Sequence, residues 1–313
     1  MDRRGLLLCL LSAAAFGSMA ILARGAYAAG MPIGTLLVGR FALAAVAFWA
    51  LVWFLRTALP SRRTQRHSLA LGAAVYAVEA ALFFIAISRL SATLAALLLY
   101  LYPFMVFLAG VLRGTERATR DRVLPLAMAG LGVGLVLSAG AGTQVIDPVG
   151  VAAAVSAAMI YTGYLLVSGP IGVNAEPLAT SALVMTGAAG ATAAVAAGTG
   201  ELSMNFALSG WLWLLALALG STVIGVWSLT AGLKRIGATN ASIISTSEPI
   251  VTVGLAMLLL GESLAPLQLV GAAGVLLALI LLQRAEPVSV SDDGAATRTT
   301  DRTAARALAH EPA

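Results

Sequence analysis

Long apolar runs recur along almost the whole chain and are separated by short polar segments. A transmembrane helix needs about 20 consecutive apolar residues to cross roughly 30 Å of hydrocarbon. The pattern therefore predicts ten transmembrane helices, joined by loops too short to hold a soluble domain. The predicted helices are Gly5–Ala23, Pro32–Leu55, Ser68–Ser88, Ser91–Leu112, Val123–Ala139, Pro148–Ser168, Pro177–Gly198, Gly210–Leu233, Thr239–Leu260 and Pro266–Gln283.

The composition also indicates a membrane protein. Of the 313 residues, 60% are hydrophobic and 11% are charged, whereas about 25% of the residues in a typical soluble domain are charged. The mean hydropathy of +0.94 is too high for a surface that water must wet. These values exclude an intrinsically disordered chain and a disulfide-stapled secreted scaffold. We therefore expect an all-α polytopic membrane protein.

Residues able to form disulfides or bind metals are few and scattered. The chain has one cysteine, Cys9, in the first apolar run, and two histidines, His67 in a basic loop and His310 near the C-terminus. A single cysteine cannot form an intrachain disulfide, and metal sites need several ligands at short spacing. We therefore expect no metal and no cofactor, and a packing role for Cys9.

Basic residues favour alternate loops. If the N-terminus lies inside the cell, thirteen of the 19 lysines and arginines fall on the inner side, and two, Arg24 and Arg89, fall on the outer side. The positive-inside rule then predicts a multi-pass protein of the plasma membrane with both termini in the cytoplasm. The same bias explains the isoelectric point near 9.9, so we expect contact with membrane lipid and no nucleic-acid partner. A signal peptide at the N-terminus is the alternative, but its removal would leave one span fewer.

The two halves of the chain resemble each other at an offset of 146 residues. This offset pairs Arg89 with Arg235, Ala92 with Ala238, Thr93 with Thr239, Ala95 with Ala241, Pro103 with Pro249 and Glu116 with Glu262. Because each half holds an odd number of predicted helices, the second half enters the membrane upside down. The sequence therefore predicts a five-plus-five inverted-topology repeat, which is a common plan of secondary transporters.

The repeat defines the predicted domains. The first five-helix unit covers residues 1–140, and the second covers residues 147–284. Residues 285–313 are rich in Ser, Thr, Asp and Arg and carry few large apolar side chains. Such a segment cannot bury enough apolar surface to fold, so we expect a disordered cytoplasmic tail.

The second half carries a family resemblance. Its residues include Gly232-Leu-Lys-Arg-Ile-Gly-Ala-Thr-Asn-Ala-Ser, then Glu248-Pro249, Leu260-Gly261-Glu262 and Gln268-Leu-Val-Gly271. The first half repeats the pattern more loosely, with Pro103 and Gly114-Thr-Glu116 at the matching places. In these motifs the chain resembles the EamA-type transporters of the drug/metabolite transporter superfamily. The resemblance implies two five-helix halves around a central cavity, alternating access, and export of amino acids or other small metabolites.

Three ionisable residues lie inside predicted spans, namely Glu79, Glu248 and Arg40. Such residues are costly in a bilayer and usually serve a function. A carboxylate near the middle of the membrane could bind a substrate ammonium or carry a coupling proton. The repeat places Glu248 opposite Tyr102 in the first half, so the two glutamates are not a repeat-related pair.

Glu248 belongs to a polar stripe. Ser242, Ser245, Glu248 and Thr252 follow one another at spacings of three, three and four residues, which places them on one helix face. Pro249 removes a backbone donor beside them, and broken helices near the midplane are where transporters place their binding sites. The stripe could equally serve helix packing.

Glu79 shares a helix face with Tyr76 and Phe83. An acid flanked by aromatic rings suits an organic cation or an amino-acid ammonium, although Glu79 could instead pair with Arg40. Arg40 could bind a substrate carboxylate, pair with Glu79 or extend to the membrane surface, and we favour a structural or gating role. Two further aromatic residues, Tyr102 and Trp227, are predicted to form cavity walls.

Glycines suggest a close helix contact. Gly130 and Gly134 form a GxxxG motif in the fifth span, and Gly271 and Gly274 lie in the tenth. Small residues let helices approach closely in a membrane. The motif is compatible with packing of the fifth span on the tenth or with a homodimer contact.

A channel for small solutes and an intramembrane enzyme are the alternative functions. An enzyme needs several polar groups that converge on one point, and the sequence has no histidine in a predicted span and no HExxH, GxSxG or Walker motif. A channel needs only a lined pore, whereas the inverted repeat is typical of transporters. We therefore predict a secondary transporter of a small-molecule substrate, with a proton as the candidate coupling ion.

Overall fold

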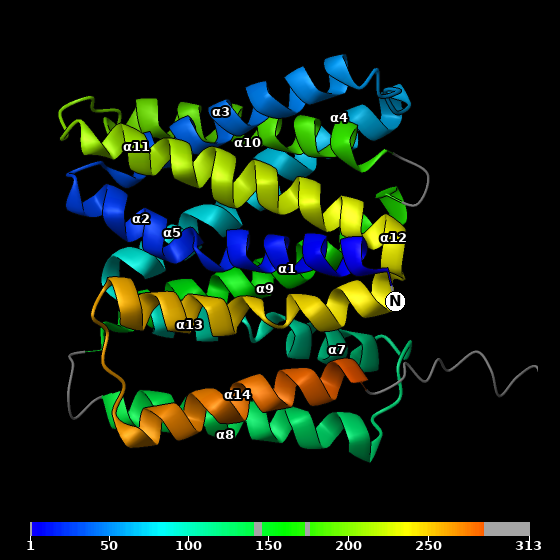
Figure 1. Cartoon of the computed structure of the whole chain (residues 1–313), viewed down its shortest axis with the longest axis vertical. Helices are drawn as coiled ribbons and strands as arrows, with labels where there is room; N and C mark the ends of the chain where they lie inside the picture. Colours follow the sequence, from blue (N-terminus) through cyan, green and yellow to red (C-terminus); the bar gives the residue numbers. More distant parts are fainter. Residues whose placement is uncertain (1, 141–145, 173–175, 285–313) are drawn as a thin grey trace, which may run out of the picture.

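In lipid, a chain must satisfy its own backbone hydrogen-bonding groups, and long apolar runs do so as helices. The computed structural model describes residues 2–140, 146–172 and 176–284, and over these residues its regular structure is entirely helical. The helix axes lie roughly along one direction, with α8 and α14 at one edge of the bundle and α3, α10 and α11 at the other (Figure 1). The predicted tail at residues 285–313 lies outside the described residues.

The elements fall into two sets on either side of residues 141–145. The first set is α1 (Arg3–Gly17), α2 (Met19–Ala28), α3 (Ile33–Phe54), α4 (Arg62–Leu71), η1 (Gly72–Tyr76), α5 (Ala77–Arg89), α6 (Ala92–Leu99), α7 (Tyr102–Leu112) and α8 (Arg120–Gly140). The second set is α9 (Pro148–Gly172), α10 (Pro177–Thr199), α11 (Ser209–Leu215), η2 (Ala216–Ile224), α12 (Gly225–Ser245), α13 (Glu248–Leu259) and α14 (Pro266–Arg284). The η segments are short π-helices.

Several expected spans are built from consecutive helices. Within the described residues, eight helical stretches are long and apolar enough to cross a membrane, among them α1 with α2 and α6 with α7. Two further apolar helical stretches, Glu248–Leu259 in α13 and Pro266–Leu282 in α14, fall short of that length. The structure therefore confirms an all-α protein with multiple membrane spans, while the full count of ten remains a prediction.

A break recurs at the same place in both halves. In the first half, Tyr100 and Leu101 separate α6 from α7, directly before Pro103. In the second half, residues 246–247 separate α12 from α13, directly before Pro249. Proline lacks a backbone N–H and its ring clashes with the carbonyl four residues earlier, so each helix is interrupted in the turn before its proline. The two breaks are related by the 146-residue offset of the sequence repeat.

The π-helical segments recur in the same way. Adding 146 to the bounds of η1 gives residues 218–222, which lie inside η2. Within η2, the Thr222 hydroxyl donates to the carbonyl of Leu217, five residues earlier, at 3.1 Å. A π-turn widens a helix and often marks a functional region. Each half therefore distorts the helix that follows its second span.

Glycines bring three pairs of helices close together. A Cβ atom on Gly132 of α8 would lie 2.6 Å from the carbonyl oxygen of Gly271 on α14, and the reverse contact is equally short. Gly130 and Gly134, the two ends of the GxxxG motif, have nothing within 4 Å. The glycine between them therefore makes the contact, and it joins the fifth predicted span to the tenth within one chain. Similar close contacts join α1 to α12 at Gly232 and α4 to α10 at Gly187.

Candidate functional site

A central cavity of about 650 Å³ lies among helices of both halves. Its walls come from α1 and α2, from α3, from α4 through α7, and from α9, α10, α12 and α13. The outer pair of described helices, α8 and α14, contributes none of the lining residues. The volume lies within the range of about 300–1,000 Å³ that small-molecule sites occupy.

The cavity extends from the middle of the bundle toward the end that carries the N-terminus. Lining residues at that end include Ser68 on α4, Thr180 near the start of α10 and Leu233 on α12. Figure 1 shows the corresponding ends of α4 and α12 on the same side of the bundle as the N-terminus.

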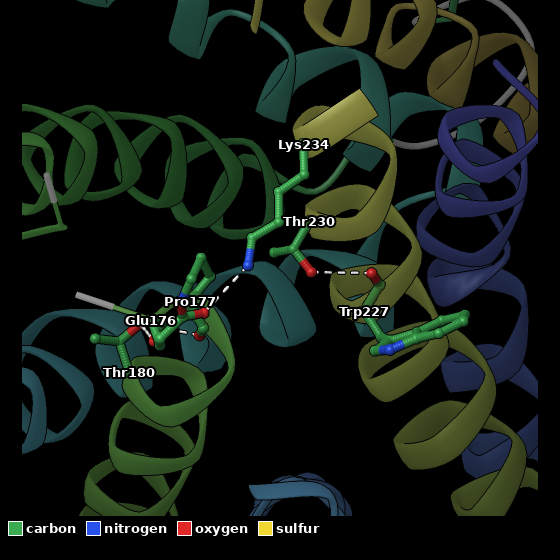
Figure 2. Close-up of polar contacts among 6 residues, drawn as sticks. All are labelled: Glu176, Pro177, Thr180, Trp227, Thr230 and Lys234. Carbon is green, nitrogen blue, oxygen red and sulfur yellow. Dashed lines mark hydrogen bonds and ion pairs between the residues drawn. The ribbon is translucent and has the colours of Figure 1, made fainter. Parts of the chain in front are cut away.

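An ion pair lies beside this end of the cavity. Nζ of Lys234, near the end of the straight part of α12, is 3.1 Å from Oε2 of Glu176, which precedes α10 (Figure 2). Both side chains are more than half exposed, at 61% and 51%. An exposed pair of this kind contributes about 0–1 kcal/mol, so it can break and form again at little cost.

At the opposite end of the bundle, hydrogen bonds join the two halves. The carboxylate of Glu262, which follows α13, accepts hydrogen bonds from the backbone N–H groups of Ala92 at 2.6 Å and Thr93 at 3.1 Å. These are the first N–H groups of α6, which have no partner within the helix. A carboxylate is favourable there because the helix dipole is positive at its N-terminus.

A second set of contacts joins α3 to the loop before α11. The backbone N–H of Gly34 donates to Oε2 of Glu201 at 3.2 Å. The hydroxyl of Thr35 donates to the carbonyl of Ser203 at 3.0 Å, and the backbone N–H of Ser203 donates back to that hydroxyl at 3.0 Å. Glu201 therefore caps α3 as Glu262 caps α6, and in both cases the acid comes from the second half of the chain.

Arg40 is almost fully buried, with 1% of its surface exposed. Its Nε donates to the hydroxyl of Thr222 in η2 at 3.0 Å. Its guanidinium carbon lies 5.2 and 5.1 Å from the ring centres of Phe41 and Phe84. Arg40 thus connects α3 to the π-helical segment of the other half, and it does not extend to the membrane surface.

Glu79 lines the cavity and is 7% exposed. The positive charge of Arg40 attracts the Glu79 carboxylate electrostatically. Among the described residues, however, no nitrogen–oxygen contact within 4.0 Å joins the two side chains. Tyr76, the aromatic neighbour expected from the sequence, lies in the same wall. The structure therefore brings Arg40, Tyr76 and Glu79 to one side of the cavity.

Glu248 lines another part of the cavity, together with Ser245 and Thr252. The hydroxyls of Ser245 and Thr252 donate to carbonyls of their own helical turns, at 3.0 and 3.2 Å. The polar neighbour of the Glu248 carboxylate is instead the phenol of Tyr100, from the break in the first half. The side chain of Ser242, the first member of the expected stripe, lies outside what the structure describes.

Trp227 does not form a wall of the cavity, contrary to our expectation. The indole is 42% exposed and points away from the Glu176–Lys234 pair (Figure 2), whereas Val226 and Leu229 of the same helix line the cavity. The residues around Trp227 lie in a continuous helix, so a shift of one position turns a side chain by about 100°. Tyr102, the other expected wall residue, does line the cavity.

Sequence reasoning does not identify the two acids that close the far end. Glu262 stands out only as part of a repeated motif, and Glu201 lies in a loop that carries no motif. The sequence does offer one signal for Glu262, namely the glycine directly before it. Gly261 has a φ of 65°, and it turns the chain at this point. The partners Ala92 and Thr93 are about 170 residues away along the chain, and sequence spacing gives no indication of such a contact.

These features define a class of protein. A helical membrane bundle with a cavity of substrate size, lined by both halves and with hydrogen bonds between the halves beyond it, is the architecture expected of a small-molecule transporter. Comparison with known proteins agrees with this class. The chain belongs to the EamA-like transporter family, which matches residues 3–138 and again residues 148–284. The protein is thus a membrane transporter and not an enzyme.

Individual relatives support the same assignment. The chain is 29% identical over 288 residues to the uncharacterized transporter YcbK of Bacillus subtilis (strain 168), with 87% of this chain and 90% of that protein covered. A protein crystal structure with 17% sequence identity superposes with a TM-score of 0.65 and covers 89% of this chain and 96% of its own. At that identity the second comparison shows a shared fold alone.

Proposed function

We propose that this protein is a proton-coupled secondary transporter that exports amino acids or other small metabolites by alternating access. The observation that carries the proposal is a central cavity that holds two carboxylates, Glu79 and Glu248, and has lining residues near the end of the bundle that carries the N-terminus. The far end is held by contacts from Glu262 and Glu201 that cross between the halves. A continuous pore would not need such contacts, which favours a transporter over a channel.

The proposal includes the membrane arrangement. All ten apolar segments cross the plasma membrane, and the ninth consists of helical residues 238–245 followed by α13, just as the fourth consists of α6 followed by α7. The second half is inverted relative to the first, and both termini are cytoplasmic, as the basic residues indicate. The cavity then faces the cytoplasm, as expected of an exporter that awaits its substrate. A homodimer stays a prediction.

Transport in proteoliposomes tests this function. Vesicles holding the full chain would be loaded with a panel of unlabelled amino acids and amines, and uptake of each labelled counterpart would be followed with and without a pH gradient. We expect saturable counterflow and accumulation driven by the gradient. Glu248→Gln should abolish the accumulation because an amide cannot carry the proton, whereas the matched exposed variant Glu176→Gln should retain it. Unsaturable flux at channel rates would contradict the proposal.

A further inference from the structure

The cavity contains five of the chain's six tyrosines, namely Tyr76, Tyr100, Tyr102, Tyr161 and Tyr164. Tyrosines are otherwise rare in this sequence, so their concentration in one cavity needs a physical reason. The rings come from η1, from the break between α6 and α7 together with the first residue of α7, and from α9. Three separate parts of the chain therefore supply phenol rings to the same enclosed space.

The five rings form a continuous wall. Tyr76 lies 5.7 Å from Tyr164, which is parallel to Tyr161 at 6.0 Å. Tyr161 meets Tyr102 edge to face at 4.7 Å, and Tyr102 lies 6.2 Å from Tyr100. All these separations lie within the range of aromatic contacts.

A carboxylate lies at each end of this wall. Glu79 adjoins Tyr76, and Glu248 adjoins Tyr100. Tyr161, in the middle, is close enough to interact electrostatically with both carboxylates. A bound molecule that rests on the wall therefore lies between two acids and against the faces or edges of several rings.

The charges of the lining do not balance. Its charged residues are Arg40, Glu79 and Glu248, which give one positive and two negative charges when all are ionised. Arg40 attracts the Glu79 carboxylate electrostatically. Its guanidinium also donates a hydrogen bond to Thr222 and makes cation–π contacts with two phenylalanine rings. Glu248 has the phenol of Tyr100 as its neighbour, and within the described part of the chain no ion pair joins it to a cation. The lining therefore has one carboxylate whose charge a cationic ligand, or a proton in its place, can neutralise.

We propose that the substrates of this transporter are organic amines with a single positive charge, bound with the ammonium at Glu248 and the carbon skeleton on the five-tyrosine wall. The proposal rests on the proposed transport function and specifies its substrate class. Aromatic faces attract an ammonium through the ring quadrupole, and the attraction is largest in a dry site. A carboxylate supplies the opposite charge, so the two features recognise the same chemical group.

Other charge types fit this lining less well. A zwitterion would leave the unpaired negative charge in place, and its own carboxylate would have to compete with Glu79 for a guanidinium that is 1% exposed. An anion would add a third negative charge. A neutral molecule would gain the aromatic contacts but no attraction to the Glu248 carboxylate, which a proton would then have to neutralise.

A set of four probes with the same aromatic body tests the substrate class. Phenethylamine carries one positive charge, phenylalanine is a zwitterion, 3-phenylpropionate is an anion and 2-phenylethanol is neutral. Binding of each to the purified full chain in detergent would be measured by calorimetry at neutral pH. We expect phenethylamine to bind at least ten times more tightly than the other three. Equal or tighter binding of phenylalanine or 2-phenylethanol would overturn the proposal.

Variants locate the site. Glu248→Gln should weaken phenethylamine binding about tenfold or more. Tyr161→Leu should weaken it about 2- to 30-fold, the range expected for loss of a cation–π contact, while Tyr161→Phe keeps the ring and should bind nearly as the wild type does. Trp227→Leu removes an aromatic ring outside the cavity and serves as the matched control. If Glu248→Gln and Tyr161→Leu both bind like the wild type, the assignment is wrong.

The outcome separates this inference from the transport function. Selective binding of phenethylamine without counterflow would support the ligand class and reject the transport function. Saturable counterflow of a zwitterionic amino acid with no binding of phenethylamine would support transport and reject the ligand class. If a variant fails to fold, the four probes on the wild-type chain still decide the question.

Discussion

The contact between Glu262 and the start of α6 offers a direct test of how the far end is held closed. We predict that Glu262→Gln opens this end without unfolding the protein. The substitution keeps the shape of the side chain but removes its charge. It also replaces one carboxylate oxygen with an NH2 group, which cannot accept a hydrogen bond from the N–H of Ala92 or Thr93.

The size of the effect follows from these two hydrogen bonds. A backbone N–H that loses its partner in a buried place costs about 1–3 kcal/mol, and the lost charge at a helix N-terminus costs about 0.3–1 kcal/mol more. A total of about 2 kcal/mol corresponds to roughly a 30-fold increase in the population that is open at this end. Thr93 is fully buried, so labelling of a cysteine at this position reports on opening around the start of α6.

Cysteine labelling measures this population. Thr93→Cys would be placed in a Cys9→Ala background, and an impermeant maleimide would be added on the side away from the N-terminus. When opening is fast relative to labelling, the labelling rate follows the open fraction. Glu262→Gln should label about 30 times faster than its parent, whereas Glu176→Gln, at the exposed pair with Lys234, should change the rate less than about fivefold. Equal rates in the two variants, with normal thermal stability, would refute the closing role of Glu262.

Two other predictions concern packing and pH. Gly132→Ala should lower the Tm in detergent by an amount equivalent to about 1–3 kcal/mol, because the added Cβ would overlap the backbone of α14. The control Gly134→Ala adds its Cβ to open space and should leave the Tm nearly unchanged. Equal losses in the two variants would contradict the glycine contact. The hydrogen bond from Arg89 lowers the pKa of the Asp147 carboxyl below its ordinary value. The ionised Asp147 therefore stabilises the folded protein above about pH 4. This stabilisation is lost as the pH falls through the lowered pKa. Thermal melts should therefore show a difference between the wild type and Asp147→Asn at pH 7 that disappears well below pH 4, and a difference that persists in acid would count against the ion pair.

The membrane class and helical fold could be predicted because they depend on local sequence. An apolar run of about 20 residues has few alternatives to a membrane helix, and proline interrupts a helix wherever it occurs in the interior. The repeated prolines, Pro103 and Pro249, therefore indicate both helix breaks from the sequence alone. The division of one predicted span into α1 and α2 near Ser18 is not visible in this way, since the sequence there contains no proline and remains apolar.

The candidate site was predictable only in part. Buried ionisable groups in a membrane must face the interior of a bundle, and this constraint places Glu79 and Glu248 in the cavity without further information. It does not determine which partners they meet, because the partners come from other helices. The phenol beside Glu248 and the hydroxyl beside Arg40 both come from the opposite half of the chain. The predicted orientation of Trp227 was wrong for a simpler reason, namely that an apolar helix surface gives almost no periodic signal about which side faces lipid.

The two halves share their helix breaks but not their chemistry. At the repeated position before the proline, the first half carries the phenol of Tyr102 and the second half carries the carboxylate of Glu248. A carboxylate in both halves would give the cavity a further negative charge and would require a second cation. Because only one half carries the acid, a single site in the lining is left to be neutralised, and a proton or an ammonium can occupy it, but not both at once. This mutual exclusion is the simplest physical basis for coupling the export of an amine to the movement of a proton.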